Sequence, residues 1–147
     1  MTGGATPQPA APPASVIIHD LDQARHVLAA AVRTECPVQL VSAPGAGAYL
    51  GPALFKQLID QARAAQPAAR VTSCLDCGDE PGTAMNAIRH EVEAISLSAE
   101  PDVLSKVGDA ARRMGVRLTP RPAPLLDMAE QGAADQLDAW LSGDTNS

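Results

Sequence analysis

Three residues whose side chains can exchange protons follow short segments predicted to be strands. His19 and Asp20 come directly after an apolar run at 16–18, and Asp76 follows a second segment at 70–75. Imidazole titrates near neutral pH, and a neighbouring carboxylate can orient it as a general base. We therefore predict that His19, Asp20 and Asp76 are catalytic residues. The alternative for His19 is a structural histidine that hydrogen-bonds loop backbone.

A glycine-rich turn follows the apolar segment at 38–41. It carries Gly45, Gly47 and Gly51, and Pro52 then begins a helical pattern. Glycine lets a backbone approach a phosphate group, and the N-terminus of the following helix favours an anion. This segment resembles a dinucleotide-binding fingerprint, and the resemblance implies that Asp76 holds a ribose. The third glycine is spaced more widely than in that pattern, and the alternative is a small-residue loop that lets the helix pack closely.

The predicted strand ends also resemble the receiver domain of a response regulator. That resemblance implies a phosphoacceptor at Asp76, an acid at Asp20 and a hydroxyl at Ser98, while Arg121-Pro122 stands where such domains have Lys-Pro. Arginine pairs with phosphate but differs from lysine in geometry and reach, so the resemblance is to a degenerate receiver-like domain. Together with the glycine turn, these positions give the predicted ligand-binding residues, which are Ser42, Gly45, Gly47, Gly51, Gly78, Ser98 and Arg121.

Cys74 and Cys77 have the spacing of a redox or metal-binding pair. A redox pair of this kind sits at a helix N-terminus, whereas Cys74 falls inside a predicted strand and is expected in the core. A zinc site needs two more ligands, and Cys36 and the histidines show no paired spacing, so we predict no metal site. Three cysteines, an odd number, without a secretory signal favour reduced thiols and a cytoplasmic location.

A repeating pattern of strands and helices must position these residues. Strands are expected to begin near 16, 38, 71, 94 and 116, with helical periodicity between them and a last helix over 125–141. The pattern predicts an α/β fold with a five-stranded parallel sheet and helices on both faces, a flavodoxin-like three-layer sandwich of strand order 2-1-3-4-5. In that order His19, Asp20 and Asp76 face each other across a crevice between strands 1 and 3. The alternative is half of a (βα)8 barrel, which would need a partner to close it.

Composition bounds the domain organisation and the partners. Residues 15–142 form one predicted α/β domain, 1–14 a disordered tail rich in proline and alanine, and 143–147 a frayed end. The net charge is −6 and only 2% of residues are aromatic, which disfavours nucleic acid because a basic patch supplies most of that affinity. No apolar run approaches the roughly 18 residues that a membrane span needs, and an anionic membrane surface is disfavoured by the charge.

The sequence contains no complete catalytic motif, and its helical segments are rich in alanine. Alanine-rich faces allow close packing between subunits, and each buries little apolar area. We therefore predict a self-associating or partner-binding regulatory or scaffold module, a homo-oligomer that can take a small anionic ligand at the Gly45–Gly51 loop. The alternative is an enzyme that acts on a phosphorylated or carboxylated small molecule at the C-terminal edge of the sheet. Neither hypothesis identifies a cofactor.

Overall fold

The computed structural model describes residues 12–143. The predicted tail over 1–14 and the frayed end over 143–147 lie mostly outside these residues, although Ala14 already belongs to the first strand and Gly143 caps the last helix. The elements in chain order are β1 (Ala14–Ile17), α1 (Leu21–Thr34), β2 (Val38–Val41), α2 (Ala46–Tyr49), α3 (Pro52–Ala65), β3 (Val71–Asp76), α4 (Pro81–Arg89), β4 (Ala94–Ser96), α5 (Pro101–Met114), β5 (Arg117–Thr119), β6 (Leu125–Asp127) and α6 (Ala133–Ser142). Within 12–143, no helix has the length and hydropathy to cross a membrane.

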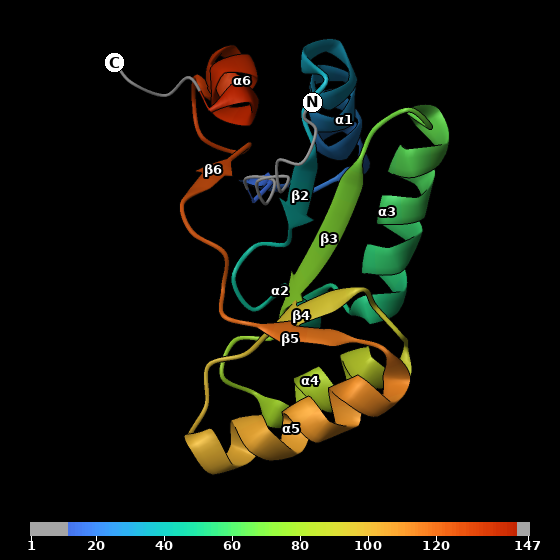
Figure 1. Cartoon of the computed structure of the whole chain (residues 1–147), viewed down its shortest axis with the longest axis vertical. Helices are drawn as coiled ribbons and strands as arrows, with labels where there is room; N and C mark the ends of the chain where they lie inside the picture. The colour runs from blue at the N-terminus through green and yellow to red at the C-terminus, as the bar shows by residue number, and fades with distance from the viewer. Residues whose placement is uncertain (1–11, 144–147) are drawn as a thin grey trace, which may run out of the picture.

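The strands of the described chain lie parallel in one sheet, in the order β5-β4-β3-β2-β1-β6 (Figure 1). The prediction of an α/β fold with a parallel sheet is therefore confirmed, and the arrangement fits the half-barrel alternative. β1 to β5 stand side by side in chain order, so each right-handed crossover returns its helix to the same face of the sheet.

The predicted strand order 2-1-3-4-5 is wrong. That order requires the chain to reverse its direction across the sheet, whereas β2 here lies between β1 and β3 and pairs with both. The crevice expected between the first and third strands is therefore filled by a strand. A receiver-like domain needs the same reversed order, so that interpretation is wrong as well.

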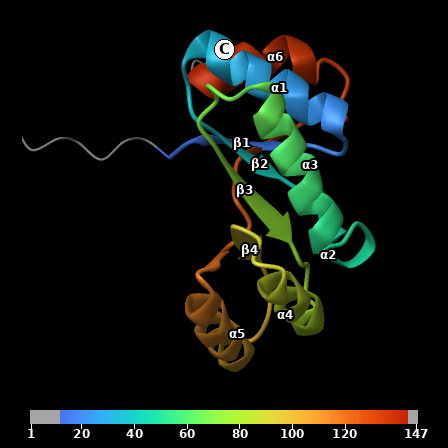
Figure 2. The ribbon, with the colours of Figure 1, turned by 90° about the vertical axis from the view of Figure 1, so that its right-hand side faces the viewer.

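The buried residues form two clusters, one on each face of the sheet. Side chains alternate along a strand, so neighbours point to opposite faces. In β1, Val16 belongs to the larger cluster, which also contains residues of all the long helices, while Ile17 belongs to the smaller one. The smaller cluster consists of the strand residues Ile17, Val41, Cys74 and Ala94. Among residues 12–143 the long helices thus pack on one face of the sheet rather than on both faces as predicted. α1 and α3 lie along β1–β3 and α4 lies beside β4 (Figure 2), while α5 contacts β5.

The chain returns to the sheet after β5 through a short linker at 120–124 instead of a helix. β6 then pairs with β1, Leu126 lying opposite Val16. The helix predicted over 125–141 is thus wrong at its start, because α6 begins only at Ala133. A strand of three residues is too short to show a period of its own, and its leucines matched the helical pattern. β5 and β6 are the two edges of a parallel sheet, so the linker must run back from the C-terminal end of one edge strand to the start of the other.

Helix starts are set by residues that suit an exposed first turn. α3, α4 and α5 begin at Pro52, Pro81 and Pro101, since proline lacks the N–H that would be unpaired there. α1 follows Asp20, whose carboxylate accepts a hydrogen bond from Gln23 N at 2.8 Å. These starts place the strand-to-helix turns at the C-terminal edge of the sheet.

Candidate active site at the C-terminal rim

The C-terminal edge of the sheet gathers polar side chains from every strand. We call six of them the rim cluster: His19 after β1, Ser42 after β2, Asp76 in β3, Ser96 in β4, Arg121 after β5 and Asp127 in β6. Parallel strands end at one edge, and in (βα)8 barrels this edge holds the active site. His19, Ser42, Asp76 and Arg121 were predicted from the sequence, whereas Ser96 and Asp127 were not.

Asp76 is the most firmly held residue of the rim cluster. Its side chain is 8% exposed, and Ser96 Oγ donates a hydrogen bond to Oδ1 at 2.6 Å. The backbone N–H groups of Gly45 and Gly78 donate to Oδ2 at 2.7 and 3.2 Å. The backbone of Asp76 also donates to Ser42 Oγ at 2.8 Å. Through its carboxylate and its backbone N–H, Asp76 therefore ties the ends of β2, β3 and β4 to the glycine loop.

The first part of the glycine loop, at Gly45 and Gly47, packs against Asp76. Gly45 has φ of 72°, the left-handed region, and its N–H is occupied by the carboxylate. A Cβ on Gly47 would lie 2.9 Å from Thr83 Cγ2 and 3.0 Å from the carbonyl oxygen of Asp76. The glycines at these two positions thus allow the loop to pack against β3 and α4. Gly51, with φ of 87°, precedes α3 on the far side of α2.

Arg121 reaches back from the β5–β6 linker over the ends of β2 and β3. Its Nη1 lies 3.5 Å from Asp76 Oδ1, and its Nη2 donates to the carbonyl oxygen of Ser42 at 3.4 Å. Nη1 is buried and has no hydrogen-bond partner among the described residues. The guanidinium is therefore a cation inside the rim cluster with only long contacts to acceptors.

His19 pairs with Asp127, not with Asp20 or Asp76 as expected. Its Nε2 lies 2.7 Å from Asp127 Oδ1, which also accepts a hydrogen bond from Ala129 N at 2.9 Å. Partial burial raises the pKa of Asp127, but the hydrogen bonds from Ala129 and His19, together with the charges of His19 and Arg121, outweigh it and lower that pKa. A carboxylate that orients an imidazole is the arrangement of a general base.

The other predicted residues lie around this edge in supporting positions. Asp20 is used as the N-cap of α1. Ser98 is exposed, and its N–H donates to Gly78 O at 2.8 Å, joining the turns after β3 and β4. Sequence reasoning missed Asp127 because β6 was read as helix. Ser96 could have been found from the sequence, since a serine within an otherwise apolar strand indicates a buried polar group with a specific partner.

The cysteine pair is buried beside Asp76. Burial raises the pKa of the Cys74 thiol to about 11. Burial, followed by the negative charge of Asp76, raises the pKa of Cys77 to about 12. Neutral thiols of this kind are poor nucleophiles and poor metal ligands. Among residues 12–143, no three histidine, cysteine or acidic side chains are grouped as a metal site requires.

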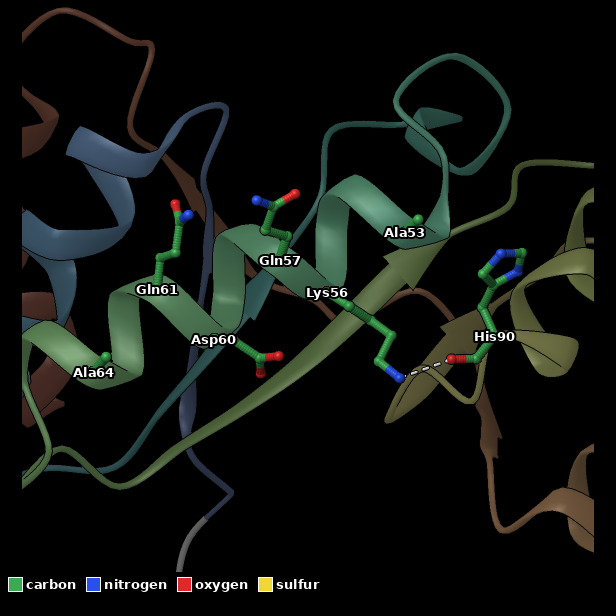
Figure 3. A pocket seen from close by; sticks show the side chains of 7 residues that line it. All are labelled: Ala53, Lys56, Gln57, Asp60, Gln61, Ala64 and His90. Carbon is green, nitrogen blue, oxygen red and sulfur yellow. Dashed lines mark hydrogen bonds between the residues drawn. The ribbon is translucent and has the colours of Figure 1, made fainter.

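A shallow groove of about 500 Å³ lies elsewhere, on the outer face of α3 (Figure 3). Its walls are mostly alanine and glutamine side chains of that helix, and Lys56 Nζ donates to His90 O at 2.8 Å beside it. The groove contains no member of the rim cluster. We place the candidate site at the rim because the proton-exchanging and cationic groups converge there.

The fold and the rim define a half-barrel of the (βα)8 type with a polar cluster where such barrels carry their active sites. No family model matches the chain. A stretch of 89 residues is 29% identical to a fructose-bisphosphate aldolase from Nostoc commune, covering 60% of this chain and 25% of that protein. The fold is similar to the crystal structure of a protein from Coccidioides immitis assigned as a fructose-1,6-biphosphate aldolase, with a TM-score of 0.60 and 15% identity over 71% of this chain and 39% of that one.

These comparisons correct the prediction of a self-associating or partner-binding module. Both similar proteins are named as fructose-bisphosphate aldolases, which are enzymes. The chain spans a quarter of the length of the curated relative and about two fifths of the solved structure.

Proposed function

We propose that this chain is an aldolase-like enzyme that cleaves a carbon–carbon bond in a phosphorylated ketose at the C-terminal rim. One observation carries the proposal: two proteins found independently, one by sequence and one by fold, are both named as aldolases of fructose bisphosphate. The rim cluster supports the proposal. Barrels of this type carry their active sites at the C-terminal ends of the strands, and in this chain a histidine, two carboxylates and an arginine lie there.

The chemistry of aldol cleavage assigns His19 the role of base. Cleavage begins when a base removes the proton of the hydroxyl that lies β to the carbonyl. The side chain of His19 is 34% exposed and can meet a substrate, while Asp127 orients its ring. Asp76 is too enclosed for that role; it holds the glycine loop and faces Arg121.

We also propose the partners and the location of the chain. The substrate is a small anionic molecule, nucleic acid is not a partner, and the chain works in the cytoplasm as a homo-oligomer. Sedimentation of the purified chain at micromolar concentration tests the last statement, and a strict monomer would contradict it.

The test is cleavage of fructose 1,6-bisphosphate by the full chain, followed by the release of triose phosphate. His19→Gln removes the base and is expected to lower kcat about 100-fold or more, a typical contribution of general-base catalysis. His26→Gln is the matched control, because His26 is exposed on α1 and its side chain makes no hydrogen bond within 12–143. Absence of cleavage by the wild-type chain for this and other ketose phosphates would refute the proposal. Equal rates for wild type and His19→Gln would remove His19 from the mechanism.

A further inference from the structure

Arg121 carries a buried hydrogen-bond donor for which residues 12–143 supply no acceptor. Within residues 12–143 Nη1 is buried and donates no hydrogen bond, and the carboxylate with which it forms an ion pair, Asp76 Oδ1, lies 3.5 Å away. The bond from Nη2 to Ser42 O, at 3.4 Å, is at the limit for a hydrogen bond. A buried donor without an acceptor is unfavourable, so a ligand oxygen placed beside Nη1 would gain a strong interaction.

The side chain of Arg121 can turn toward such an oxygen at little cost. It is 28% exposed and extends from the linker at 120–124 rather than from a strand or helix. Its contacts within the rim are long, whereas Asp76 is held by three shorter bonds from other groups and keeps its position without Arg121.

The charges around Arg121 select the kind of oxygen that can bind. Asp76 lies on one side, and the charge of Arg121 is also felt by Asp127, whose pKa it helps to lower. A phosphate dianion beside Arg121 would bring two negative charges close to these carboxylates, and it would be repelled more strongly than the single charge that develops on an enolate. A carbonyl oxygen is neutral and accepts hydrogen bonds, so it fits this position, and the phosphoryl groups of a substrate must lie elsewhere.

We propose that Arg121 binds the carbonyl oxygen of the ketose and stabilises the enolate oxygen that forms from it. This inference rests on the proposed function and names the electrophile of the same site. His19 takes the hydroxyl proton, the hydroxyl carbon becomes an aldehyde, and the electron pair of the broken carbon–carbon bond forms the double bond of the enolate. The negative charge then lies on the oxygen beside Arg121. The protonated imidazole returns the proton to the enolate carbon, so the step balances without an oxidant or reductant.

The inference predicts a second reaction that requires no bond cleavage. Cleavage of fructose 1,6-bisphosphate between its third and fourth carbons releases dihydroxyacetone phosphate, which the site would convert reversibly to the enolate. In D2O its α-proton would exchange for deuterium, and proton NMR measures that rate. We expect Arg121→Gln to slow exchange and cleavage about 100-fold or more through kcat, the usual effect of removing one oxyanion donor. KM should change much less, since the phosphoryl groups bind elsewhere.

Two variants separate this role from a structural one. Arg121→Lys keeps the charge and is expected to recover at least part of the lost exchange rate, and it remains informative if Arg121→Gln does not fold. Arg113→Gln, an exposed arginine of α5, is the control and should exchange like wild type. Exchange by Arg121→Gln at the wild-type rate, or a loss confined to KM, would overturn the inference alone. A wild-type chain that neither exchanges nor cleaves would overturn the proposed function together with it.

Discussion

Replacing Asp76 by asparagine preserves the shape of the side chain but turns one of its two acceptor oxygens into an NH2 group, which donates hydrogen bonds. Oδ2 accepts two backbone bonds, from Gly45 and Gly78, and Oδ1 accepts one from Ser96 and faces Arg121. An amide group at Oδ2 would confront two N–H donors. At Oδ1 it would confront the guanidinium, although the hydroxyl of Ser96 could turn to accept. Even the better orientation loses one bond to a charged acceptor and an ion pair, so we expect about 2–4 kcal/mol of destabilisation.

Urea unfolding followed by circular dichroism measures this difference. With an m-value of about 2 kcal/mol/M, the midpoint of Asp76→Asn should fall by about 1–2 M. The amides of Gly45 and Gly78 should also exchange faster with solvent, which hydrogen-exchange NMR resolves. Asp79→Asn is the matched control, because Asp79 is exposed and its side chain makes no hydrogen bond within 12–143; it should unfold within about 0.5 kcal/mol of wild type. If Asp76→Asn did the same, Asp76 would not be the anchor of the rim.

Three further perturbations test the neighbourhood. Gly47→Ala should lower the free energy of unfolding by about 1–3 kcal/mol, because its Cβ would overpack against Thr83 and Asp76. Gly82→Ala is the control: its Cβ meets nothing within 4 Å, so this variant should leave the free energy of unfolding unchanged or raise it. Equal melting temperatures of the two variants would contradict the close packing of the loop. Asp127→Asn should make the free energy of unfolding less dependent on pH below about pH 4. The pKa of Asp127 in the folded protein lies below its ordinary 3.8, so the carboxylate stabilises the fold above about pH 4 and this stabilisation is lost as the pH falls further. Unfolding measured at several pH values checks this. Iodoacetamide at about pH 8 should alkylate the half-buried Cys36 and spare Cys77, whose pKa burial raises to about 12; mass spectrometry showing both modified at one rate would disprove the enclosure.

Local patterns were sufficient to locate most elements. The apolar segments at 16–18 and 38–41 mark the buried strands β1 (Ala14–Ile17) and β2 (Val38–Val41), and Pro52 and Pro101 begin helices because their missing N–H suits a first turn. The pattern failed at β6, where three residues give no measurable period and two leucines suit either structure. Because the pattern does not predict β6, it does not place Asp127 among the candidate site residues.

The sequence by itself determined that strands and helices alternate and that polar residues follow the strands. Those features depend on neighbours along the chain, and they already implied that His19 and Asp76 end at one edge of a parallel sheet. Only the tertiary structure decided the order of the strands, since every order of parallel strands satisfies the same local pattern. It also decided that His19 pairs with Asp127 and that Arg121 reaches Asp76. These contacts join residues that are 108 and 45 positions apart in the chain. They depend on how the sheet curves and where the linker crosses it, which no local periodicity reveals.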